Sequence, residues 1–385
     1  MNYNHPHRDG STIILRVMCA IVFLAFSFLW LYYFQADVLT IAQHVLSHGK
    51  THYNSLLGAL LITSLLQLLQ VLVAAFLKLK KRTHALTYLP SMLVLGLVSD
   101  INTDIDQHFS LGGWWWVFPL LLIVWGLLVL LARIYQSVEP DEPGGILSRR
   151  VWINMLIMAL LIIGVVSVAN TQAAFHYRVH VETSLLRGDY EEALRVGERS
   201  LESDASLTML RFYALARQGE LGERLFHYPV SIKGVDVLPF DSLSGVRTII
   251  YPADSIFRFL GAIPKSNVKT SAQYLSLLEK KEKATSAVGD YQLCAMLIDK
   301  DIDGFARAIG RYYEVNDSLP RHYREALVLY RHLRSHPVQV LLDDVMEADY
   351  KDFRSLESQY ADKRERKVRV GEKFYGTYWF YYYYL

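Results

Sequence analysis

The feature that most constrains this chain is a set of long apolar runs that all lie within residues 1–171. An α-helix needs about 20 apolar residues to cross the hydrocarbon core of a bilayer. Five runs come near that length and predict membrane spans near residues 12–34, 55–76, 86–101, 114–133 and 151–170. The run at 86–101 is the weakest, because its apolar stretch is short and interrupted by Pro90. Residues 1–171 are therefore expected to form a transmembrane bundle of about five spans.

The first run is expected to remain as an anchor rather than be removed as a signal peptide. It is longer than the apolar core of a signal peptide, which has roughly 7–15 residues. No small-x-small cleavage site follows it, since the next residues are Phe34-Gln-Ala-Asp. Arg16 falls one turn inside the run, where its long side chain can reach back to the lipid headgroups.

Positive charge beside the runs predicts the side of the membrane on which each loop lies. A basic cluster at Lys78–Arg82 follows the second run, and another basic segment extends from Arg133 to Arg150. The loop Asp100–His108 between them carries aspartates and neither lysine nor arginine. Because positively charged loops stay in the cytoplasm, both basic segments are expected inside. The run at 86–101 must then cross, the N-terminus is cytoplasmic, and residues 172–385 lie outside.

Polar residues inside the spans favour helix packing over transport. Ser64, Gln67 and Gln70 repeat every three residues on the second span and so share one face. Side chains placed in this way usually hydrogen-bond a neighbouring helix, although a substrate path is the alternative. Apart from Arg16, no ionisable residue lies deep in a span, and this disfavours a proton or ion transporter.

The outer loops carry a candidate polar cluster of histidines and acids. Its members are His44, His48, His52, Asp104 and His108. The first two histidines are one helical turn apart, a spacing compatible with metal binding. No close carboxylate completes such a set, so a short amphipathic helix lying on the bilayer is favoured and no metal or cofactor is expected.

The second half of the chain alternates helical patterns with glycine turns. Residues 188–194 resemble the turn and second helix of a tetratricopeptide unit, and Met209–Tyr228 resembles another, with Gly219 at its turn. A third lies in Asp290–Pro320, where Phe305, Ala308, Tyr312 and Pro320 occupy the aromatic, small, aromatic and proline positions. An α-helical-repeat domain at 172–385 is the prediction, and a generic helical bundle is the alternative. Tyr190, Phe305 and Tyr312 are its candidate interaction residues.

Two other segments of this half are irregular in composition. Pro229–Pro252 contains several glycines and prolines and is expected to be a loop or a short hairpin. Phe374–Leu385 is nearly all aromatic, which suits a strand or a membrane interface. This tail either caps the helices of its own domain or docks on the membrane or a partner through Tyr378 and Trp379.

Several stretches together resemble an uncharacterised family of multi-pass bacterial envelope proteins, known only as a domain of unknown function. They are Phe34-Gln-Ala-Asp, Gln43-His44, Thr51-His52-Tyr53, Gly219-Glu-Leu, Leu225-Phe226, Asp290-Tyr291, residues 297–301, residues 319–327 and Thr377-Tyr378-Trp379. The resemblance runs along most of the chain, although its middle near 230–264 is shorter than is usual in such proteins. It implies a membrane-anchored helical-repeat architecture in the bacterial inner membrane, with residues 172–385 in the periplasm, and it implies no activity.

Catalytic and nucleic-acid functions receive no support from the sequence. The net charge is only +2, and there is no nucleophile elbow, phosphate loop, zinc-protease motif or dinucleotide fingerprint. Its two cysteines are too far apart to predict a disulfide or a zinc site. The leading hypothesis is a non-catalytic scaffold that binds a protein partner at the envelope. The alternative is a membrane enzyme, or a subunit of one, that acts on an envelope lipid or glycan through the outer loops.

Overall fold

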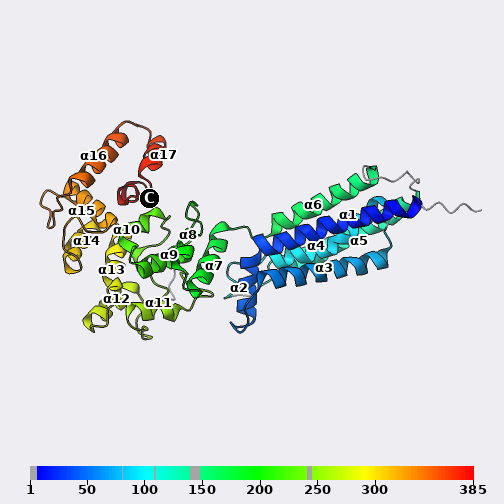
Figure 1. Ribbon diagram of the computed structural model, residues 1–385, viewed down its shortest axis with the longest axis horizontal. Helices are drawn as coiled ribbons and strands as arrows, with labels where there is room; N and C mark the ends of the chain where they lie inside the picture. Colours follow the sequence, from blue (N-terminus) through cyan, green and yellow to red (C-terminus); the bar gives the residue numbers. More distant parts are fainter. Residues whose placement is uncertain (1–6, 80, 108–109, 139–147, 241–244) are drawn as a thin grey trace, which may run out of the picture. The chain divides into compact units, whose positions relative to one another are not determined.

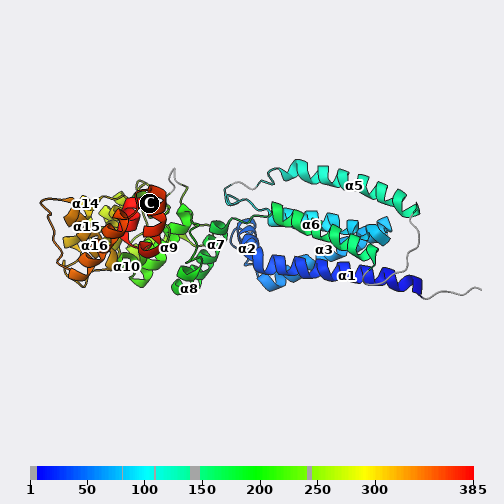
Figure 2. The same cartoon turned by 90° about the horizontal axis from the view of Figure 1, so that it is seen from above.

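The computed structural model describes residues 7–79, 81–107, 110–138, 148–240 and 245–385, and it divides into two compact units. Unit 1 is Met1–Gln172 and unit 2 is Ala173–Leu385. Over the residues so described, every regular element is a helix and no strand occurs, which confirms the all-α class. Figure 1 and Figure 2 show the course of the chain within each unit.

Unit 1 is a helical bundle with a short helix, α2, at one end. Its elements are α1 (His7–Leu29), the π-helical turn η1 (Trp30–Phe34), α2 (Ala36–Leu46), α3 (Ser55–Leu77), the 3-10 helix η2 (Lys81–Tyr88), α4 (Leu89–Ser99), α5 (Trp114–Val138) and α6 (Arg149–Val168). In both views α1, α3, α4 and α6 lie side by side, and α2 lies at one end of them.

Four stretches of unit 1 are long and apolar enough to cross a membrane. They are Ile13–Phe34, Ser55–Leu77, Trp114–Ile134 and Arg149–Val168, as predicted for four of the five spans. Large apolar side chains such as Leu61, Leu72 and Phe76 point outward from them, as the lipid-facing surface of a bundle requires. The chain is therefore an α-helical multi-pass membrane protein.

The predicted span at 86–101 is not one of these four helices. The α-helix there, α4, has only 11 residues and carries Pro90 in its first turn. Proline is accommodated in a first turn because the N–H that it lacks would have no intrahelical partner there. The residues before it wind into the 3-10 helix η2 instead, so the segment is a composite of two helix types.

Hydrogen bonds fix the direction of this composite segment along the bundle. The Ala85 N–H donates to Oδ1 of Asn154 near the start of α6, and the Asn170 N–H beyond the end of α6 donates to the Ser99 carbonyl. The composite segment therefore runs parallel to α6. The Ser91 hydroxyl donates to the Leu66 carbonyl of α3 at 2.8 Å.

Unit 2 consists of short helices around one apolar core. They are α7 (Ala173–Leu186), α8 (Tyr190–Arg195), α9 (Ala205–Gln218), α10 (Leu221–Arg224), α11 (Ala253–Leu260), α12 (Ser271–Lys280), α13 (Ala287–Ile298), α14 (Ile302–Ala308), α15 (Arg321–Leu333), α16 (Asp344–Ser358), α17 (Lys363–Phe374) and α18 (Tyr378–Tyr384), with 3-10 turns at Leu225–His227, Gly234–Asp236 and Ile309–Arg311.

The same turn joins three pairs of consecutive helices in unit 2. Each turn pairs a residue of positive φ with an acidic residue: Gly188 and Asp189, Gly219 and Glu220, and Lys300 and Asp301. In each, the N–H of the acidic residue donates to the carbonyl five residues earlier at 2.9–3.0 Å, as in a Schellman C-cap. The second helix of each pair, α8, α10 or α14, is short.

The segment 229–252, predicted as a loop or a hairpin, has no α-helix or strand in the part that the structure describes. Its end is held by the buried carboxylate of Glu182, which accepts hydrogen bonds from the N–H groups of Ile249, Ile250 and Tyr251. Arg178 donates to the same carboxylate from one turn earlier on α7, at 3.3 Å. A single buried carboxylate thus organises an irregular segment.

Candidate functional site

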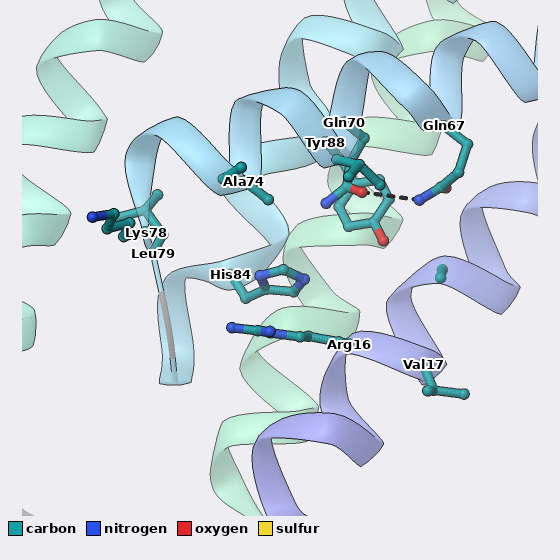
Figure 3. A pocket seen from close by; sticks show the side chains of 12 residues that line it. Arg16, Val17, Gln67, Gln70, Ala74, Lys78, Leu79, His84 and Tyr88 are labelled. Carbon is teal, nitrogen blue, oxygen red and sulfur yellow. Dashed lines mark hydrogen bonds between the residues drawn. The ribbon is translucent and has the colours of Figure 1, made fainter. Parts of the chain in front are cut away.

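A cleft of about 790 Å³ lies between α1, α3 and η2 in unit 1 (Figure 3). Its lining residues come from those three elements and from the turn after α3: Arg16, Val17, Ala20, Gln67, Gln70, Val71, Ala74, Ala75, Lys78, Leu79, His84 and Tyr88. Most of the wall is apolar, and its polar groups are of two kinds. Three basic side chains lie towards one end, and two glutamines lie towards the other.

Arg16, Lys78 and His84 form the basic end of this cleft. The Arg16 side chain lies alongside the His84 ring (Figure 3). His84 is 4% exposed, and its Nδ1 atom is buried without a hydrogen-bond partner among the described residues. No aspartate or glutamate is among the residues that line the cleft. The basic end therefore has an unsatisfied capacity for a negatively charged or hydrogen-bonding group.

The glutamines of α3 form a short hydrogen-bonded series. Gln67 Nε2 donates to Gln70 Oε1, and Gln70 Nε2 donates to the Thr87 hydroxyl of η2, both at 2.9 Å. The predicted bond between this polar face and a neighbouring helix is thus confirmed for Gln70. Ser64 is exposed on the outer surface of α3, and the Oε1 atom of Gln67 is buried without a partner in the described chain.

The predicted outer-loop residues lie on the last turn of α2, in the loop after it, and in a separate turn after α4. α2 ends at Leu46, so His48, which has a φ of 52°, lies beyond it and not one helical turn above His44. Burial, and then the nearby His52, lowers the pKa of His44. Asp104 belongs to a separate turn, in which its N–H donates to Asn102 Oδ1. His108 lies outside the described residues.

The predicted interaction residues of unit 2 divide by burial. The side chains of Phe305, Tyr378 and Trp379 are fully buried in the core and offer no surface to a partner. Tyr190 and Tyr312 are half-buried. Tyr190 packs under the Arg217 guanidinium, and the Tyr312 hydroxyl donates to Glu279.

The aromatic tail forms helix α18 rather than a strand. Its first turn begins at Thr377, whose hydroxyl accepts from the Phe380 N–H. Trp379 is 1% exposed, and its indole N–H donates to the Glu325 carbonyl at 2.8 Å. The tail therefore packs within unit 2, as the capping interpretation of the sequence predicts.

A buried pair on α15, which the sequence analysis missed, holds this tail. The Glu325 carboxylate accepts from His322 Nδ1 at 2.9 Å and from the Tyr378 N–H at 2.7 Å. His322 Nε2 accepts from the Phe226 N–H, so its proton lies on Nδ1. Burial alone would raise the pKa of Glu325, but His322, the Tyr378 N–H and Arg321 hold that pKa below its usual value. With both side chains inaccessible, the pair is structural.

The stretches of unit 2 that carry the family resemblance meet around this pair. Their connecting hydrogen bonds run from Phe226 N–H to His322, from the Tyr323 hydroxyl to Asp290, and from the Tyr381 hydroxyl to the Ile298 carbonyl. The segments are distant in sequence but form one packed region. Packing in one shared core thus accounts for these stretches, none of which forms a catalytic motif.

Residues 263–385 match the model of a family of unknown function (DUF6057). This part of the chain extends from the end of α11 to the C-terminus and contains the His322–Glu325 pair and the tail. The resemblance expected along most of the chain is therefore shown for its C-terminal region. No curated protein and no solved structure matches the chain.

Proposed function

We propose that the protein is a non-catalytic envelope scaffold whose unit 1 crosses the membrane five times and holds unit 2 outside the cytoplasm, where unit 2 binds a protein. The observation that carries the proposal is the separation of charge between the two ends of unit 1. Basic residues flank one end and aspartates the other. Hydrogen bonds between neighbouring segments indicate which segments meet at each end.

The composite segment of η2 and α4 is long enough to be the fifth crossing. A 3-10 helix rises about 2.0 Å per residue and an α-helix about 1.5 Å. Lys81–Tyr88 has 8 residues and Leu89–Ser99 has 11, so together they extend roughly 32 Å, and the part after His84 extends roughly 24 Å. A bilayer of ~30 Å hydrocarbon thickness accommodates a short span of this kind by local thinning. Because the segment runs parallel to α6, a membrane that α6 crosses is also crossed by this segment.

α5 supports the same assignment from the opposite direction. The Trp114 indole N–H at its start donates to Asp100 Oδ2 at 2.6 Å, just after α4. Near its end, the Arg133 guanidinium donates to the Leu77 carbonyl at the end of α3. Lys78, Arg133 and Arg149 therefore belong to one end of the bundle, and Asp100 belongs to the other. The positive-inside rule puts the basic end in the cytoplasm.

Two features of unit 2 support the proposal that it binds a protein. Its three equivalent turns join helices in pairs, the arrangement from which helical-repeat proteins build binding surfaces. The segment before α16 and the first turn of that helix also present exposed aliphatic side chains, namely Val338, Val340, Leu342 and Val345. Aliphatic groups gathered in this way are typical of surfaces that a partner covers.

Reporter fusions test this proposal. Alkaline phosphatase fused after Leu385 is expected to be active, because the enzyme matures only outside the cytoplasm, and green fluorescent protein at the same point is expected to be dark. For partner binding, photo-crosslinkers at Val340 and Leu342 are expected to capture one protein reproducibly, whereas a crosslinker at exposed Lys363 is not. An inactive phosphatase would refute the sidedness, and equal capture at all three positions would refute the binding surface.

A further inference from the structure

We infer that the cleft between α1, α3 and η2 binds the headgroup of an anionic phospholipid, with Arg16 as the ligand of its phosphate and Lys78 and His84 beside it. Arg16 and His84 lie together in a cleft whose lining contains no carboxylate, and Lys78 lines the same end. Among the described residues, no acidic side chain forms an ion pair with Arg16 or Lys78. A phosphate diester is the membrane component that supplies the missing charge and several strong acceptors.

The position of the basic end matches the level of a lipid headgroup. Lys78 directly follows α3, a candidate membrane helix that ends at Leu77. Arg16 lies one turn inside the span that begins at Ile13. Long basic side chains at the ends of spans extend to the membrane–water boundary, where lipid phosphates lie.

His84 distinguishes this site from ordinary contact with bulk headgroups. A lysine or arginine at the surface of a bundle can exchange among many lipids, but His84 lines the cleft, is buried, and has no hydrogen-bond partner for its Nδ1 atom among the described residues. A buried nitrogen of this kind is costly unless a ligand or water satisfies it. A headgroup hydroxyl beside the phosphate would donate to this nitrogen.

The rest of the cleft suits the lipid's glycerol and acyl chains. Val17, Ala20, Val71, Ala74 and Ala75 supply an apolar wall with small side chains, which leaves room for a chain. The Gln67 amide lines the same cleft, where it donates to Gln70. The absence of a carboxylate from the lining favours a lipid without a quaternary ammonium, such as phosphatidylglycerol, over phosphatidylcholine.

Native mass spectrometry of the full chain in mild detergent tests the inference. With both lipids added, the wild type is expected to retain one phosphatidylglycerol in preference to phosphatidylcholine. Arg16→Gln is expected to weaken this retention about tenfold, because it removes a charge-assisted hydrogen bond. Gln67→Leu is expected to weaken it less. Arg149→Gln removes an exposed cation at the same end of the bundle but outside the cleft, and it is expected to behave like the wild type.

Each other outcome would overturn the inference. Equal retention of the two lipids would mean that no headgroup is recognised, and an equal loss in Arg16→Gln and Arg149→Gln would mean that only general surface charge acts. Displacement by excess inorganic phosphate would assign the site to a free anion. The leaflet, on the cytoplasmic side, rests on the proposed topology, but retention in detergent does not, so the two can fail separately.

Discussion

Glu325 is the residue on which the most distant parts of unit 2 depend. Its carboxylate and carbonyl connect α15 to the first turn of α18, and its neighbour His322 connects α15 to Phe226. Glu325→Gln keeps the size of the side chain but places an N–H₂ group among hydrogen-bond donors. We expect the free energy of unfolding to fall by about 2–4 kcal/mol. Denaturant titration of the purified chain measures this.

The matched control is Glu372→Gln, which removes an exposed carboxylate 3.4 Å from Arg369. Surface pairs of this kind contribute little, so its effect is expected to stay below about 0.5 kcal/mol. Similar losses in both variants would contradict a special role for Glu325.

The lowered pKa of Glu325 predicts how stability depends on pH. Its folded pKa lies below the ordinary value of about 4.3. The stabilisation is therefore complete above that value and is lost as the pH falls through the lower, folded pKa. Melting temperatures are expected to converge for wild type and Glu325→Gln as the pH is lowered from 6 towards the acid limit of solubility. A difference that stays constant or widens would be inconsistent with this sign.

At the scale of elements, α18 is expected to be a part of the fold and not a free docking tail. Trp379 fills the core between α15 and α16, where its ring lies 5.2 Å from that of Tyr350. Trp379→Ala is expected to cost about 3–5 kcal/mol, because it leaves a large cavity. Limited proteolysis should then cleave the variant faster than wild type, whereas Leu385→Ala, at an exposed position, should be unchanged. An intact fold with loss of a co-purified partner would instead support recognition by the tail.

Elements differ in how far the sequence could predict them. Four spans followed from apolar length, and the turns at Gly188 and Gly219 followed from residues that readily take positive φ. The tail was harder, since tyrosine-rich segments favour strands, yet Thr377 caps a helix that the core then buries. The Glu325 network was not predictable, because its partners Tyr378 and Phe226 lie far from α15 in sequence.

At the scale of the whole molecule, the central claim is that the composite segment of η2 and α4 crosses the membrane. If it crosses, the loop after α4 and unit 2 share one side, and the start of α6 lies on the other. If it does not, the loop after α4 stays on the side of the basic cluster that follows α3. The charges of the flanking loops predicted this crossing. The length of the apolar run did not predict it, because the 3-10 helix η2 and Pro90 leave an α-helix of only 11 residues.

Cysteine labelling in intact cells tests that claim most directly. Both native cysteines, Cys19 and Cys294, are buried, so the background is low. A membrane-impermeant maleimide is expected to label Ser110→Cys and Ser335→Cys in intact cells, and to label Arg149→Cys only after permeabilisation. Labelling of Arg149→Cys in intact cells, or protection of Ser110→Cys until the membrane is opened, would contradict the five-crossing arrangement.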